Sequence, residues 1–124
     1  MPNPQMTWRT LTINADGDLD HLPSQMSGHT DDGIAWFVVN NSPVQVKLKI
    51  KDFKKKSNGA AVNAVDFFLQ RATVDPGDRG MVVGQIVFRP AGPSGTTVLT
   101  KYTIELRSDL LDWDFDPDLE IEKP

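Results

Sequence analysis

Apolar and polar residues alternate along the segment 44–51, which reads Val-Gln-Val-Lys-Leu-Lys-Ile-Lys. Successive side chains of a β-strand point to opposite faces, so this spacing places four hydrophobic side chains on one face and the polar ones on the other. A second alternation runs from Val98 to Leu106. The two patterns predict strands that bury one face and expose the other.

Four further segments are typical of strands. Residues 6–13 mix Trp8 and aliphatic residues with threonines, a composition that suits a first strand. The run 34–39 is almost wholly apolar, which predicts a strand covered on both faces or one at the centre of a sandwich. Residues 81–89 are rich in valine but contain Gly84, which indicates a β-bulge, and Leu119 with Ile121 predicts a last strand.

Two segments are harder to assign. Residues 14–33 are polar and rich in Gly, so we expect a long connecting loop, and long loops in compact domains are often functional. In the segment 60–72, Val62, Val65 and Leu69 have helical spacing, whereas Val65, Phe67 and Leu69 alternate. We expect a short helical turn followed by a strand that ends near Val74.

About seven strands separated by turn residues predict an all-β fold, an antiparallel β-sandwich with at most one short helix. The length of 124 residues predicts a single domain, 1–124. The turn Asp75-Pro76-Gly77-Asp78 between two strands and the closing region with Tyr102 and Asp116-Pro117-Asp118 resemble immunoglobulin-like and cupredoxin-like β-sandwiches of small bacterial proteins. The resemblance implies the fold without a copper site, because cupredoxins use a cysteine ligand and this chain has no cysteine.

Charge is segregated along the chain. The net charge is −4, which argues against general affinity for nucleic acid. Six of the thirteen Lys and Arg residues nevertheless lie within residues 47–56, and seven of the seventeen acidic residues lie within 109–122. Such blocks are typical of solvated faces, and they also offer an electrostatic means of pairing with a partner.

The acidic segment contains two large aromatic residues, Trp113 and Phe115, at alternate positions. Aromatic side chains in so charged a segment either pack onto the sandwich or are covered by a partner. In the second case, the lysine strand of a neighbouring copy is a candidate for the opposite surface. The predicted partner-binding residues are Lys47, Lys49, Lys51, Trp113, Phe115, Asp112, Asp114 and Asp116.

An alternative hypothesis is a small-ligand or metal site in the 14–33 loop. His21, Met26 and His29 all lie there, and imidazole with thioether is a ligand set that suits copper. Two histidines in a polar loop also need no function, so the two interpretations stay open.

Other chemistry finds little support in the sequence. The absence of cysteine excludes disulfides, thiolate nucleophiles and Cys-ligated metals. There is no nucleophile elbow, glycine-rich phosphate loop or His-Glu metal helix, so we expect neither an enzyme nor a cofactor. No signal peptide or long apolar span is present, which predicts a cytoplasmic protein without membrane contact. We therefore expect a binding or assembly module that recognises a protein, or a second copy of itself, through strand edges and the acidic aromatic segment.

Overall fold

A computed structural model describes residues 5–21, 25–110 and 112–124, and these residues form ten strands and no helix. Within them, therefore, no helix is long and apolar enough to cross a membrane. The strands are β1 (Met6–Ile13), β2 (Met26–His29), β3 (Gly33–Asn40), β4 (Val46–Lys55), β5 (Val65–Leu69), β6 (Arg71–Val74), β7 (Arg79–Ile86), β8 (Thr97–Arg107), β9 (Asp112–Phe115) and β10 (Asp118–Glu122).

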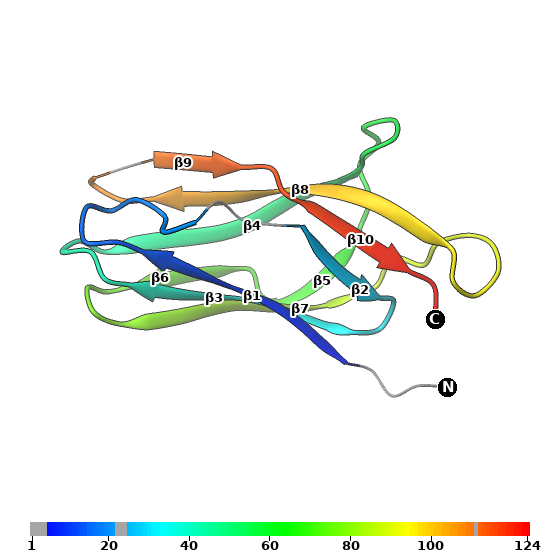
Figure 1. The fold of residues 1–124 in the computed structure, drawn as a ribbon, viewed down its shortest axis with the longest axis horizontal. Coiled ribbons are helices and arrows are strands. Elements are labelled where there is room, and N and C mark those ends of the chain that lie inside the picture. The colour runs from blue at the N-terminus through cyan, green and yellow to red at the C-terminus, as the bar shows by residue number, and fades with distance from the viewer. Residues whose placement is uncertain (1–4, 22–24, 111) are drawn as a thin grey trace.

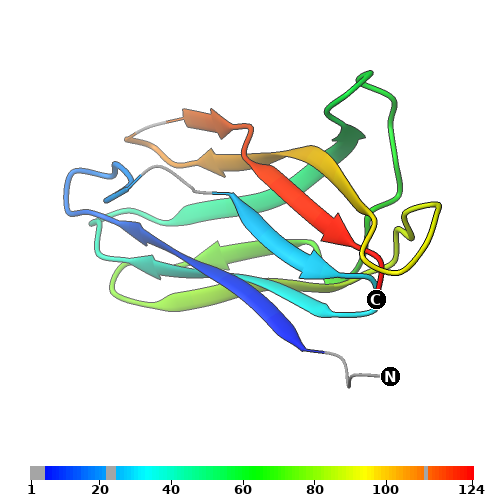
Figure 2. The ribbon, with the colours of Figure 1, turned by 45° about the vertical axis from the view of Figure 1, so that its right-hand side comes forward.

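The strands form two sheets packed face to face (Figures 1 and 2). Sheet A has the order β1-β3-β7-β5, and sheet B has the order β2-β10-β8-β4-β6 with β9 also paired to β8. The predicted β-sandwich is confirmed. The expected antiparallel pairing is wrong at two places, because β1 pairs with β3 and β2 pairs with β10 in parallel. The chain passes through sheet B between β1 and β3, and this crossover allows their parallel alignment.

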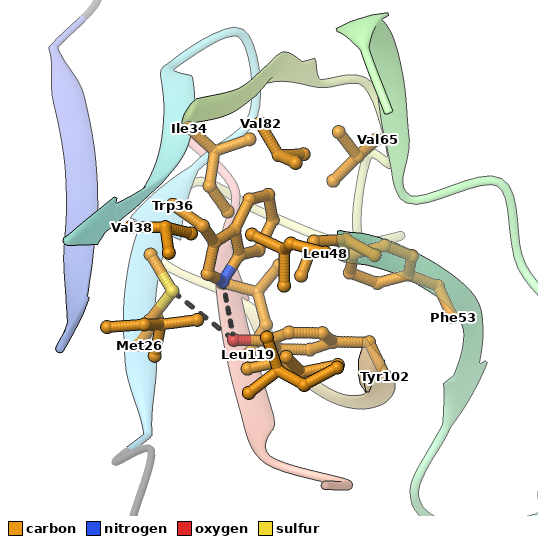
Figure 3. Close-up of a cluster of buried hydrophobic side chains, with 14 of the residues drawn as sticks. Met26, Ile34, Trp36, Val38, Leu48, Phe53, Val65, Val82, Tyr102 and Leu119 are labelled. Atoms are coloured by element: carbon orange, nitrogen blue, oxygen red, sulfur yellow. Dashed lines mark hydrogen bonds between the residues drawn. The ribbon is translucent and has the colours of Figure 1, made fainter. Parts of the chain in front are cut away.

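The core lies between the sheets and contains a hydrogen-bonded aromatic cluster (Figure 3). The indole Nε1 of Trp36 donates to the hydroxyl of Tyr102 at 3.0 Å, and that hydroxyl donates to Sδ of Met26 at 3.4 Å. Phe53 stacks on Tyr102 with ring centroids 5.0 Å apart. Burial raises the pKa of Tyr102 to about 12, because the charged phenolate would lose its hydration.

The segment 14–33 is not one loop, which corrects the sequence prediction. It contains β2, whose four residues pair with β10. Met26 is fully buried, and Gly28 lies so close to sheet A that a Cβ there would stand 2.8 Å from Cδ1 of Ile86. A four-residue strand gives a weak pattern of its own, and pairing with β10 decides its conformation.

The segment 60–72 contains no helical turn, and the predicted strand is divided into β5 and β6. A register shift in β5 between Phe67 and Leu69 also interrupts the alternation, because the extra residue places Leu69 on the opposite face from Val65. The bulge indicated at Gly84 therefore lies in the neighbouring strand, where Gly84 is the partner of Phe67.

Candidate functional site

The lysine strand, which is part of β4, and the acidic segment, which contains β9, lie on either side of β8 in sheet B. Their charged side chains lie on the outer face of this sheet. In register, Lys49 is opposite Glu105, and Glu105 is opposite Asp114. Nζ of Lys51 lies 2.6 Å from Oε2 of Glu105, and Arg107 lies 2.9 Å from Asp114. The Lys51–Glu105 hydrogen bond raises the pKa of Lys51 and lowers the pKa of Glu105. Glu105 and Arg107 of β8 thus pair with one block each, and the two blocks meet directly where Nζ of Lys56 lies 2.7 Å from Oδ2 of Asp118.

The aromatic residues of the acidic segment pack onto the sandwich. Trp113 and Phe115 are partly buried against the core, and their rings stack with centroids 5.3 Å apart. Thr103 Oγ1 donates to Asp116 Oδ1 at 2.9 Å, whereas Asp112 remains exposed. The packing alternative is confirmed for the two aromatic side chains. The partner-binding role of the eight residues in these two blocks stays a prediction.

The structure does not bring the predicted metal ligands together. Met26 is buried in the core, and the side chain of His21 is exposed beside Asp20. His29 forms an ion pair through Nε2 with Glu122 and lies 3.4 Å from Asp32 through Nδ1. Because β2 turns Met26 inward, the three side chains do not lie together as one ligand set. Within residues 5–21, 25–110 and 112–124, no group of three or more His, Asp or Glu side chains could hold a metal ion.

Exposed hydrophobic residues gather on the other sheet. Of the seven large hydrophobic residues that are exposed in the described ranges, six belong to sheet A. They are Met6 and Trp8 on β1, Phe37 on β3, Phe68 and Leu69 on β5, and Met81 on β7. Only Leu110 lies elsewhere. Sheet A therefore presents hydrophobic side chains to solvent while its inner face fills the core.

Strand register aligns five of these side chains on one surface, which we name the apolar face: Met6, Trp8, Phe37, Leu69 and Met81. Trp8 is in line with Ala35, Val83 and Leu69 across all four strands. Phe37 is the direct partner of Met81 in the next row. Phe37 and Met81 are directly opposed and lie within contact range, and Met6, Trp8 and Leu69 lie on the same face in neighbouring rows.

The bulge in β5 completes this face. Val65 and Phe67 point into the core, and without the bulge Leu69 would follow them. The register shift turns Leu69 outward, where it is 50% exposed. Phe68, the inserted residue, is 70% exposed at the edge of the sheet.

The apolar face continues to the edge of sheet A at β1. Odd-numbered residues of β1 form the backbone hydrogen bonds to β3. Two of these bonds run from Gly33 N–H to Gln5 O and from Asn41 N–H to Ile13 O. The backbone groups of Met6 and Trp8 therefore point away from the sheet, where no described strand pairs with β1. The Arg9 guanidinium donates to the Trp8 carbonyl at 3.1 Å and to the Gln25 carbonyl, which links this edge to the start of β2.

Sequence reasoning missed the apolar face. The run 34–39 was expected to be covered on both faces or to lie at the centre of the sandwich. β3 is an inner strand of sheet A, yet Phe37 on its outer face is 38% exposed. The first strand contained one indication of it. Trp8 has an even number whereas Leu11 and Ile13 have odd numbers, so in a strand Trp8 lies on the opposite face from those two residues. Parity alone does not tell which of the two faces is buried. The structure buries Leu11 and Ile13.

No protein-family model and no curated protein matches this sequence. Among solved structures, it resembles the chaperone–tip adhesion subunit complex CsuC–CsuE of Acinetobacter baumannii. The TM-score is 0.62 at 12% identity, over 80% of this chain and 53% of that chain. The E. coli chaperone DraB gives a TM-score of 0.61 at 9% identity, over 96% of this chain and 58% of that chain.

The PapD-like domain 7 of human CEP192 gives a TM-score of 0.53 at 11% identity, over 93% of this chain and 80% of that one. The chain spans little more than half the length of the chaperone chains that it resembles. At such low identity, these likenesses show the fold alone. The immunoglobulin-like β-sandwich of the expected resemblance is confirmed as a fold, and the cupredoxin-like part stays an expectation.

Proposed function

We propose that this chain is a non-enzymatic protein-binding module whose partner docks on the apolar face and extends over the β1 edge. The main support for this proposal is the concentration of exposed hydrophobic side chains on sheet A. Large exposed apolar patches on soluble proteins are typical of interaction sites, because covering them releases hydration water. The backbone groups of Met6 and the N–H of Trp8, which point away from β3, favour a polypeptide partner, since an added strand can bond to them, whereas the Trp8 carbonyl already accepts from Arg9.

Two observations favour this surface over the predicted acidic segment. Trp113 and Phe115 already pack on the core, and Asp114 and Asp116 already have partners in the chain. One structural neighbour is a complex of a chaperone with an adhesion subunit, so this fold can serve protein binding. That partner belongs to the neighbour, and the chemistry we propose here is only that of a protein segment with apolar side chains.

Site-specific photocrosslinking in the source cells tests the proposal. A photoreactive residue at Met81 should give one adduct, and excess wild-type protein should compete it away. The variant Phe37→Thr/Met81→Thr should not compete, because it removes the centre of the apolar face while keeping strand-forming residues. Leu110 is the matched control, since it is similarly exposed but lies away from sheet A.

The proposal fails if Leu110 gives the same adducts as Met81, or if no adduct is saturable. An adduct with the mass of two copies of the chain would identify the partner as the protein itself. Circular dichroism of the double variant confirms that it keeps the strand content of the wild type.

A further inference from the structure

A second surface, on sheet B, combines unpaired positive charge with an open strand edge. Lys47 and Lys49 on β4 and Arg71 on β6 line a shallow depression of about 320 Å³. Of the described ion pairs, none includes these three residues, whereas Lys51, Glu105 and Arg107 on the same face are paired. Register places Arg71 directly opposite Lys49, and Thr73 opposite Lys47. Two neighbouring strands thus present three free cations to solvent.

The edge beside these cations has backbone groups available for pairing. The hydrogen bond from Ile50 N–H to Gln70 O shows that even-numbered residues of β6 bond to β4. The N–H and C=O groups of Arg71 and Thr73 therefore point away from β4. β6 is the last strand of sheet B, so no described strand pairs with it on that side.

We propose that an extended acidic polypeptide segment adds to β6 and places carboxylates over Lys47, Lys49 and Arg71. An added strand would lie about 4.8 Å from β6, and its side chains on the outer face would recur at every second residue. Acidic residues at that spacing match the cations opposite them, and lysine side chains are long enough to reach across β6. This site goes beyond the proposed function, because it lies on the other sheet and requires a partner of opposite chemistry.

The same surface disfavours two other occupants. Nucleic acid would need stacking partners, and the outward positions of β6 and of β4 along the depression carry no aromatic residue. Pairing of β6 with β6 of a second copy would bring two sets of cations together, which is repulsive. An acidic peptide alone uses both the charges and the open backbone.

Fluorescence anisotropy with a labelled peptide of alternating Glu and Thr tests the proposal at low salt. The wild-type protein should bind this peptide and should not bind the same peptide with Lys in place of Glu. The variant Lys47→Glu/Lys49→Glu should lower the affinity about tenfold or more, which corresponds to about 1.4 kcal/mol. The control variant Lys54→Glu/Lys55→Glu changes the net charge by the same amount on the same strand. Its two residues follow the register shift between Lys51 and Lys54, so it should have little effect on the affinity.

Amide hydrogen exchange separates strand addition from simple charge attraction. The peptide should slow exchange at Arg71 and Thr73, because their N–H groups would become bonded. The proposal is overturned if the wild type does not bind, if both double variants lose equal affinity, or if these two amides exchange at an unchanged rate. Equal competition by an oligonucleotide of the same charge would likewise reject a peptide-specific site.

Discussion

At the residue scale, Tyr102 links the two sheets. Its hydroxyl accepts a hydrogen bond from Trp36 on sheet A and donates to Met26 on sheet B, so both of its polar functions are satisfied in the core. Phe53 stacks on its ring. Alternation along residues 98–106 predicts that Tyr102 belongs with the buried set. Its hydrogen-bond partners come from distant strands, and no local pattern identifies them.

Tyr102 gives a prediction for alkaline pH. It is the only tyrosine of the chain, so phenolate absorbance reports its ionisation alone. We expect a pKa of about 12 in the native protein and about 10 in the denatured chain. Since the unfolded state loses its proton first, the free energy of unfolding should fall as pH rises from about 10 towards 12.

The measurement is a pH titration of absorbance together with urea unfolding at each pH. Tyr102→Phe should remove this component of the pH dependence. It should also destabilise the protein by about 1–3 kcal/mol, because Trp36 Nε1 is then buried without an acceptor. A native titration midpoint near 10 would contradict the buried, bonded hydroxyl.

At the scale of elements, the bulge in β5 decides which side chains sheet A exposes. β7 lies close to the bulged strand at Gly84. A Cβ added at Gly84 would lie 2.6 Å from the Asp66 carbonyl oxygen and 2.7 Å from Cγ1 of Val65. The sequence predicted a bulge at Gly84 in β7. The structure places the bulge in β5, the strand that pairs with β7 at this position. The missing information was the pairing of β5 with β7, which a single strand does not encode.

Gly84→Ala should therefore destabilise the fold by about 1–3 kcal/mol, as overpacking against backbone cannot relax by a rotamer change. Gly33→Ala is the matched control on the adjacent strand, where the added Cβ meets only the flexible end of Met6 at 3.0 Å. Urea unfolding measures both variants. An equal loss of stability in the two would show that β5 does not lie against Gly84 as described.

At the scale of the whole molecule, part of each charged block is already paired within one sheet. Lys51 pairs with Glu105 and Asp114 with Arg107 on β8, and Lys56 of one block pairs with Asp118 of the other. The surface that remains for association is apolar on sheet A and basic at the β6 edge. Association of two copies through the paired residues of these blocks would have to break contacts that each chain already makes.

Light scattering at low and high salt should therefore give the same mass. Salt screens exposed charges but does not weaken apolar contacts, so any oligomer formed through the apolar face should survive. If the wild type is an oligomer, Phe37→Thr/Met81→Thr should convert it to a monomer at both salt concentrations. A mass that falls on adding salt would instead support pairing between the lysine strand of one copy and the acidic segment of another.

The sequence by itself determined the fold class and the buried faces of β4 and β8, because alternation with period two is a local property of the chain. It also determined the absence of cysteine chemistry and the segregation of charge. Tertiary structure alone decided the division of the strands between two sheets, the existence of β2 and the outward turn of Leu69. These features depend on pairing between segments far apart in the sequence, and pairing brought the charged blocks together and left the apolar face uncovered.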